Sequence, residues 1–346
     1  MIHRYASPGD SLGSMSESPA SAPSTAVVIG AGVIGLSCAL GLSRAGWSVT
    51  IVAEQPATET VSGVAGGIWF PYKAEASPRA ERLLKTSFDR FVELADDPAS
   101  GVDLVEGLWV ERLPGTDRSW TASARNVRRA PEGEVPRGAR DGIVAELPII
   151  DMPTFLPWLA AQATAAGVTT LEASVDSVGQ ALDVVRSASG ETPALAVVAA
   201  GEGSGAILGD DATGYPIRGQ VVKLEQAGIT HWLVDDDHED GMIYVIPRRN
   251  DVVVGGTADE GETDTTYSQE TEDAILRRAI EAYPALAGLA VKERAVGLRP
   301  ARPALRLEEA EGQPVRTLAA YGHGGAGVTL CWGTAEEIVE LAGPAS

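Results

Sequence analysis

The glycine motif GAGVIG at 30–35 constrains the fold of this chain more than any other stretch. A short β-branched run, TAVVI at 25–29, leads directly into it, and the helical pattern LSCALGLSRAG follows. A GxGxxG sequence between a strand and a helix is the context in which this motif binds a dinucleotide. Gly30 permits the tight turn, Gly32 lets a pyrophosphate approach the helix N-terminus, and Gly35 lets helix and strand pack closely.

A second strand and an acidic residue complete the nucleotide pattern. The run WSVTIVA at 47–53 predicts the strand, and Glu54 follows it about 20 residues beyond the last glycine of the motif, where an acid accepts hydrogen bonds from an adenosine ribose. An acid there disfavours NADP, whose additional phosphate requires an arginine. The motif does not by itself separate FAD from NAD.

Composition excludes several classes of function. The chain has 346 residues, long enough for two domains, and 44% of them are hydrophobic, which is ample for a large core. Its net charge of −21 argues against nucleic acid or an anionic membrane as the main partner. With only two cysteines and four histidines, we expect neither a disulfide scaffold nor a metal site, and a reducing cytoplasm fits best.

Two N-terminal segments need separate interpretation. Residues 1–24 are rich in Ser, Pro, Ala and Gly, and they predict a disordered arm. The uncharged run at 26–43 reaches the length of a membrane span or a signal-peptide core. Its glycines are better explained by the nucleotide motif, so we expect no membrane segment.

Two further glycine-rich segments favour a flavin over a nicotinamide. The stretch TETVSGVAGGIWFPYKAE starts at 58, where a simple dehydrogenase would continue its alternation of strands and helices. Near the C-terminus, YGHGGAGVT at 321–329 precedes a helical pattern, which repeats the order of strand, glycine loop and helix. Backbone amides at such a helix start can stabilise the negative charge of a reduced flavin.

Together these motifs resemble those of D-amino-acid oxidases and their relatives among the glutathione-reductase-type FAD oxidases. The string YGHGGAGVT before a WG helix carries the resemblance most distinctly. It extends over most of residues 25–342 and includes GGIWFPY, RGQVVKLE, YVIPR, VVGG and GLRPARPALRLE in the order that the family shows.

The resemblance implies an α/β (α+β) fold, with a Rossmann-like FAD-binding domain and a second domain built on a mostly antiparallel sheet. The FAD-binding domain would be discontinuous, over 25–75, 150–205 and 295–346, and the substrate-binding domain would comprise 76–149 and 206–294. FAD would be held non-covalently. Its expected contacts are Gly30, Gly32, Val33, Ile34, Gly35, Glu54, Thr60, Ser62, Gly66, Gly67, Ile68, Val175, Gly324, Gly325, Ala326, Gly327, Val328 and Thr329.

The substrate site of an amino-acid oxidase requires a partner for a carboxylate. Arginine suits this role because its planar fork donates two charge-assisted hydrogen bonds. Arg299, Arg302 and Arg306 compete on spacing alone, and the resemblance selects Arg299. The family tyrosine that contacts the same carboxylate matches Tyr244, and the carbonyl of Gly325 would accept a hydrogen bond from the substrate amine.

Three other positions bear on the active site: 240, 323 and 331. The second active-site tyrosine of the family is absent, because position 240 is Asp. His323 invites assignment as a general base, but in this motif we expect it to support the glycine loop. Cys331 could attach a flavin covalently, and the alternative is that it is a small buried thiol.

The activity implied is oxidation of a D-amino acid by hydride transfer to flavin N5, with oxygen as the acceptor and hydrogen peroxide as a product. The acidic segment at 234–241 favours neutral or even basic substrates over acidic ones. Alternatives are a glycine or sarcosine oxidase of the same fold, a D-aspartate oxidase, and a flavin- or NAD-binding protein without oxidase activity. A homodimer is compatible with the sequence, which displays no apolar interface.

Overall fold

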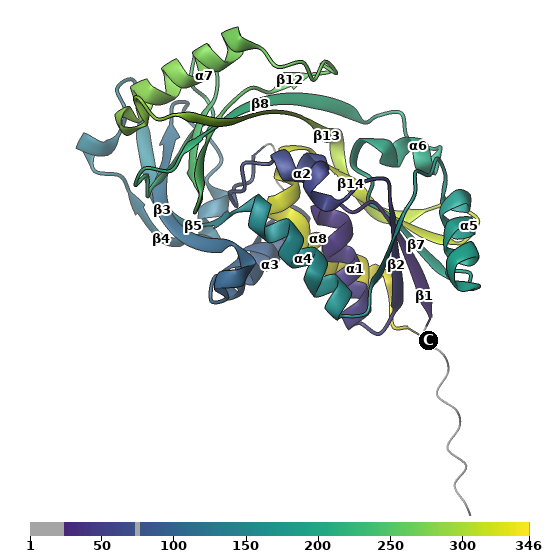
Figure 1. The fold of residues 1–346 in the computed structure, drawn as a ribbon. Coiled ribbons are helices and arrows are strands. Elements are labelled where there is room, and N and C mark those ends of the chain that lie inside the picture. Colours follow the sequence, from purple (N-terminus) through teal and green to yellow (C-terminus); the bar gives the residue numbers. More distant parts are fainter. Residues whose placement is uncertain (1–23, 73–76, 346) are drawn as a thin grey trace, which may run out of the picture.

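The computed structural model describes residues 24–72 and 77–345, and the described strands form one 14-stranded sheet. The arm predicted at the N-terminus lies outside the described residues except for Ser24. Figure 1 shows the sheet extending from the end that carries α7 (Gln269–Ala282) to the end that carries α5 (Val178–Ser189).

Parallel strands form the end of the sheet that carries the N-terminal glycine motif. β1 (Thr25–Ile29) lies between β2 (Ser48–Ala53) and β7 (Leu195–Val198), and all three are parallel. β6 (Thr169–Glu172) extends the sheet beyond β2, and β14 (Arg316–His323) pairs with β7, again in parallel. The strands predicted around 25–29 and 47–53 are therefore confirmed.

Helices cover both faces of this parallel part, because successive residues of β1 point to opposite sides. Val28 belongs to the larger apolar cluster, together with side chains of α1 (Val33–Arg44) and α8 (Gly327–Ala342). Val27 belongs to a second cluster that contains the buried face of α5. Two more helices pack on the side of α1 and α8, as Figure 1 shows: α3 (Pro78–Leu94) and α4 (Met152–Ala165).

The rest of the sheet is antiparallel apart from one parallel pair. β8 (Tyr215–Glu225), β10 (Ile243–Pro247) and β11 (Asp251–Gly255) pair antiparallel with their neighbours, whereas β3 (Val102–Glu111) pairs in parallel with β9 (Trp232–Asp235). α7 covers this part over a third apolar cluster. The remaining strands are β4 (Arg125–Arg129), β5 (Asp141–Ile150) and β12 (Asp259–Glu260).

The long strand β13 (Val291–Ala310) joins the two parts of the sheet. Its first half pairs with β8 and its second half with β14, and Figure 1 shows it running beneath β8 toward β14. The predicted domain boundary at residue 295 falls inside this strand. Short helices complete the fold: α2 (Val61–Val64), α6 (Ser204–Leu208) and single turns at Ala57–Glu59, Pro98–Ser100, Ser119–Ala122, Glu132–Glu134, Gly201–Gly203, Pro284–Leu286 and Gly324–Ala326.

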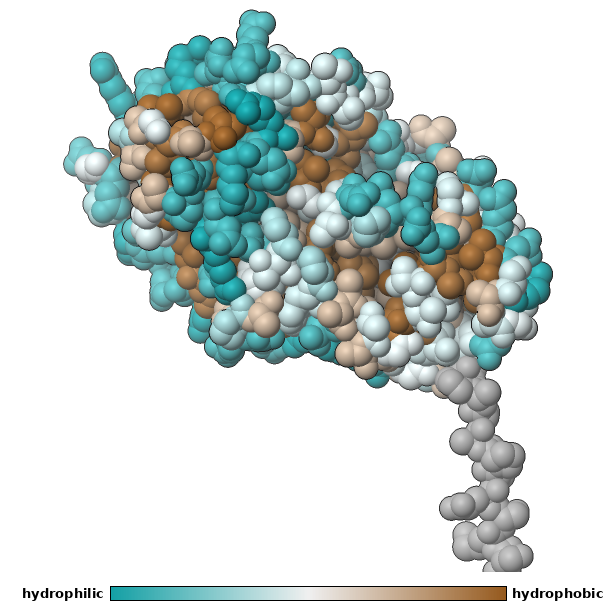
Figure 2. Space-filling view, viewed as in Figure 1, coloured by the Kyte–Doolittle hydropathy of each residue, from teal (hydrophilic) through white to brown (hydrophobic). Residues whose placement is uncertain are grey.

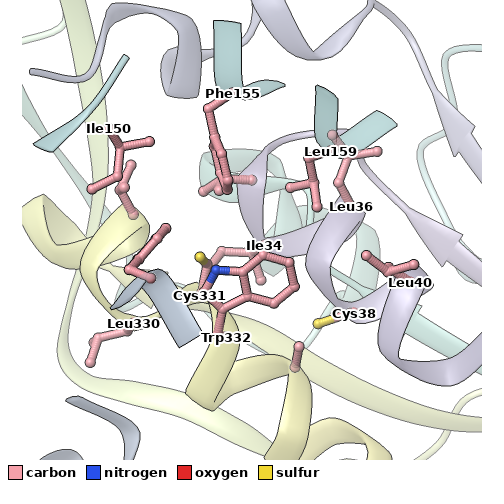
Figure 3. Packing of buried hydrophobic residues seen from close by; sticks show 14 of the residues in the cluster. Ile34, Leu36, Cys38, Leu40, Ile150, Phe155, Leu159, Leu330, Cys331 and Trp332 are labelled. Atoms are coloured by element: carbon pink, nitrogen blue, oxygen red, sulfur yellow. The ribbon is translucent and has the colours of Figure 1, made fainter. Parts of the chain in front are cut away.

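Both cysteines lie in the helical core. Figure 3 shows Cys38 of α1 and Cys331 of α8 among apolar side chains of α1, α4 and α8, with the indole of Trp332 between these helices. Both thiols are free and fully buried, and burial raises the pKa of Cys331 to about 12. A neutral thiol in this position packs as a small apolar group.

On the face in Figure 2, hydrophilic residues cover much of the surface, and apolar residues form patches between them. No helix within residues 24–72 and 77–345 has the length and apolarity needed to cross a membrane.

Candidate active site

A cavity of about 590 Å³ extends from the loop after β1 to the antiparallel part of the sheet. Most of the predicted site residues line it, including Arg299 and Tyr244. Gly35, Val175 and Ala326 are not among the lining residues. Val175 lies between β6 and α5 and packs against the cluster under α5. The cavity brings the following predicted residues together: Gly30, Gly32, Val33, Ile34, Glu54, Thr60, Ser62, Gly66, Gly67, Ile68, Tyr244, Arg299, Gly324, Gly325, Gly327, Val328 and Thr329.

The loop after β1 needs glycine at two positions for different reasons. Gly30 has a φ of 108°, and a Cβ there would lie 2.5 Å from the carbonyl oxygen of Ala199. A Cβ on Gly35 would overlap the carbonyl oxygen of Gly30. Gly35 therefore lies in the contact between helix and strand, as the sequence motif predicts, and not in the cavity wall.

The hydroxyl of Ser62 lies at the N-terminus of α1. Its Oγ accepts a hydrogen bond from the backbone N–H of Val33 at 3.0 Å, and a Cβ on Gly32 would come within 3.2 Å of the same oxygen. The neighbouring Thr60 has a local role, because its Oγ1 donates to the carbonyl of Ala57 at 2.7 Å and caps α2. Of the two predicted hydroxyls, Ser62 is the one that contacts the helix start.

The second glycine loop brings another helix N-terminus to the cavity. It connects β14 to α8, with Gly324 at a φ of 54°. Thr329, in the first turn of α8, donates a hydrogen bond from Oγ1 to the carbonyl of Phe70 at 2.9 Å, which ties this loop to the segment at 66–72. A Cβ on Gly325 would lie 2.5 Å from the ring of Tyr72, a lining residue that the sequence did not single out.

His323 lines the cavity directly before this loop, and its ring is tied to α8. Its Nε2 lies 2.9 Å from Oγ1 of Thr334 in α8. Burial lowers the pKa of His323 to about 3, so the imidazole is neutral at physiological pH. This placement agrees with the expected supporting role.

The residues present fit a bound FAD. Two helices of more than three turns, α1 and α8, begin at the cavity, and glycine loops precede both of them. The same cavity is lined by Glu54, the predicted adenosine contact, and by the second glycine loop. Neither cysteine lines the cavity, so a thiol link to a flavin has no support within the described residues.

Arg299 and Tyr244 meet on the antiparallel wall of the cavity. Nη1 of Arg299 donates to the carbonyl of Thr257 at 2.9 Å. Tyr244 lies beside the guanidinium, and burial raises the pKa of the phenol although the positive charge of Arg299 opposes this effect. The phenol therefore stays protonated near neutral pH and can donate a hydrogen bond.

Two glycines leave the space that these side chains occupy. A Cβ on Gly219 of β8 would overlap the guanidinium of Arg299, and a Cβ on Gly255 of β11 would overlap the ring of Tyr244. Gly255 lies directly opposite Tyr244 in the strand pairing. The sequence contained this signal as VVGG following YVIP, but only the strand register assigns the glycines to their partners.

The competing arginines lie outside the cavity in ion pairs. Arg306 forms two 2.8 Å hydrogen bonds to Asp210 and one of 2.9 Å to Tyr321 Oη. Arg302 pairs with Asp211 at 2.7 Å and lies over the ring of Tyr321. Both guanidinium groups are thus committed to structural partners.

Asp236 is a lining residue that the sequence did not single out. It follows β9, and its Oδ1 accepts a hydrogen bond from Nε1 of Trp109 at 3.1 Å. In contrast, His238 on the same loop does not line the cavity. Within the described residues, Arg299 is the one lysine or arginine among the lining residues.

Comparisons with known proteins agree with this geometry. Residues 25–341 match the family DAO, described as FAD dependent oxidoreductase. The chain is 40% identical to a D-amino-acid oxidase of Rubrobacter xylanophilus and 39% identical to one of Streptomyces coelicolor, covering 92% and 91% of this chain and 96% of each relative. Among solved structures, glycine oxidase from Geobacillus kaustophilus has a TM-score of 0.75 at 17% identity, over 92% of this chain and 94% of the other.

Proposed function

This chain belongs to the DAO family of FAD-dependent oxidoreductases, and we propose that it oxidises D-amino acids, with neutral side chains favoured over acidic ones. One observation carries the proposal. A cavity that fits FAD is also lined by a half-buried arginine and a half-buried tyrosine, Arg299 and Tyr244, which together can bind a carboxylate.

The nucleotide end of the cavity would hold the cofactor through backbone groups. The N-terminus of α1, with Ser62 beside it, would bind the pyrophosphate, and Glu54 would bind the ribose; all of these residues line the cavity. The loop at 324–329 would stabilise the negative charge of the reduced ring. When bound, FAD supplies a hydride acceptor for the substrate Cα–H and passes the electrons to oxygen, which yields hydrogen peroxide.

Orientation would provide most of the rate enhancement. Arg299 would bind the substrate carboxylate with its planar fork, and Tyr244 would donate a hydrogen bond to the same group. The carbonyl of Gly325 would accept a hydrogen bond from the substrate amine. His323 is neutral and already paired with Thr334, so proton transfer by this residue is not required. The imino acid would leave and hydrolyse in water to an α-keto acid and ammonia.

The proposal divides the chain between the two tasks. Residues 25–75, 150–205 and 295–346 would form the FAD-binding domain, which contains the parallel strands β1, β2, β6, β7 and β14. Residues 76–149 and 206–294 would form the substrate-binding domain, which contains most antiparallel strands. A homodimer would be compatible with this division.

The alternatives within the fold make different demands on the cavity. A D-aspartate oxidase needs a second cation for the side-chain carboxylate, but the described lining residues offer only Arg299. A glycine or sarcosine oxidase would use the same arginine, so only assays with different substrates can distinguish these activities. A flavin-binding protein without oxidase activity would form no peroxide.

Peroxide release with a substrate panel tests the proposal. The holoenzyme would be assayed with D-alanine, D-valine, D-methionine, their L enantiomers, D-aspartate, glycine and sarcosine. We expect the neutral D-amino acids to give the highest kcat/KM. Turnover of D-aspartate well above these three, or of glycine or sarcosine in their place, would contradict the proposal.

A further inference from the structure

Asp236 lines the cavity and lies near Tyr244 in the sheet. It comes two positions after Val234, which is opposite Tyr244 in the pairing of β9 with β10, and directly follows the last residue of β9. Val234, Tyr244 and Asp236 all line the cavity, so the carboxylate is close to the carboxylate clamp without belonging to it.

The three consecutive aspartates at 235–237 have different environments. Asp235 is fully buried and accepts hydrogen bonds from Arg112, with 2.6 Å between Nη2 and Oδ2. Asp237 is not among the lining residues. Only Asp236 combines a place in the cavity wall with a neutral partner, the indole of Trp109. A single carboxylate, and not an acidic cluster, therefore faces the substrate.

The charges around Asp236 leave its carboxylate uncompensated. No ion pair joins Asp236 to a lysine, arginine or histidine among the described residues. Burial raises the pKa of Asp236, and the nearby Asp237 and Asp235 add to the effect. A partly buried carboxylate without a cation is costly, and a cation brought by a ligand would relieve that cost.

We propose that Asp236 determines side-chain specificity by pairing with an ammonium or guanidinium group at the far end of a D-amino acid, as in the lysine, ornithine and arginine class. The inference rests on the proposed function, because Arg299 must hold the α-carboxylate for the side chain to point toward Asp236. The same carboxylate repels acidic side chains, which explains physically why acidic substrates are disfavoured.

Paired substrates of similar shape provide the test. D-Lysine and D-norleucine differ by the terminal ammonium group, so the ratio of their kcat/KM values isolates its contribution. The holoenzyme and the variant Asp236→Asn would be compared, with Asp237→Asn as a matched control that removes the same charge from outside the cavity. Asp236→Glu restores the charge, and retention of FAD would be checked by the visible spectrum of each variant.

We expect Asp236→Asn to lower the ratio for D-lysine over D-norleucine by roughly tenfold or more, the usual effect of losing a hydrogen bond between charged groups. Asp237→Asn should keep the ratio within about twofold, which is the usual range for surface changes. Asp236→Glu should recover part of the ratio, and kcat/KM for D-glutamate should rise in Asp236→Asn.

Two results would overturn the inference in different ways. An unchanged ratio in Asp236→Asn, with D-norleucine still oxidised, would remove Asp236 from substrate recognition and leave the proposed function intact. Equal losses for D-lysine and D-norleucine would show a merely structural role. If no D-amino acid were oxidised by the unaltered enzyme, the proposed function itself would fail, and the inference with it.

Discussion

The guanidinium of Arg299 lies beside the phenol of Tyr244 on the cavity wall, and neighbouring strands provide a glycine behind each side chain. This relationship brings together four separate sequence segments, GLRP, YVIPR, VVGG and RGQVV, at the proposed carboxylate-binding site. Most of the predictions below disturb either this pair or the two glycine loops.

Replacement of Arg299 by lysine should reduce kcat/KM for neutral D-amino acids by about 100-fold, because lysine keeps the charge but loses the bidentate fork. FAD should remain bound. Steady-state kinetics and the visible spectrum measure the two effects. Arg306→Lys in the same segment is the control, since Arg306 pairs with Asp210 outside the cavity. Equal losses in both variants would refute the assignment of Arg299.

Alanine at position 219 should displace the guanidinium of Arg299, since the new Cβ would overlap it. A misplacement of about 1 Å can cost roughly 100-fold in rate. We therefore expect a large loss of kcat/KM with little change in FAD content. Gly214→Ala is a matched control, because its Cβ would meet nothing nearer than 3.8 Å. Normal activity of Gly219→Ala would show that Arg299 is not held in this position.

Removal of the Ser62 hydroxyl should weaken the start of α1, where it accepts a hydrogen bond from the N–H of Val33. Loss of a comparable helix cap costs about 0.5–2 kcal/mol. Urea unfolding of Ser62→Ala should show this loss, together with weaker FAD binding in a titration. Ser43→Ala, near the other end of α1, removes a hydroxyl that donates to the carbonyl of Ala166 and should leave FAD affinity unchanged. Full FAD affinity in Ser62→Ala would count against the assigned role.

Acidification should destabilise the protein partly through His323. Its pKa falls from the ordinary 6.5 to about 3 in the folded state, so the unfolded chain binds the proton more readily between these values. Stability present above pH 6.5 is thus lost as pH falls toward 3, by up to about 1.4 kcal/mol per pH unit. His323→Gln should show a shallower decline in unfolding free energy from pH 7 to 5. Parallel curves for the two proteins would contradict this expectation.

Local sequence patterns predicted the nucleotide end of the fold because its constraints are local. The strand at 25–29, the turn glycine Gly30 and the helix that follows are consecutive in the chain, and their spacing specifies their geometry. The same holds for the loop and helix after His323.

Local sequence patterns could not predict which distant strands pair or in what register. Gly219 meets Arg299 through the register of β8 with β13, and no local signal encodes that register. Asp236 could not be distinguished from Asp235 by composition, because only the path of the chain after β9 decides which carboxylate faces the cavity. The sequence did not predict a role for Tyr72 of GGIWFPY, because its ring lies against Gly325, which is far away in the sequence.

Anaerobic titration of the holoenzyme with amino acids, followed through the visible absorption of its flavin, tests the central claim most directly. We predict that neutral D-amino acids bleach the flavin bands and that their L enantiomers, glycine and sarcosine do not. Added oxygen should then restore the bands and form peroxide. Bleaching by glycine or sarcosine but not by D-amino acids would contradict the account, as would a protein that remains colourless after FAD is added.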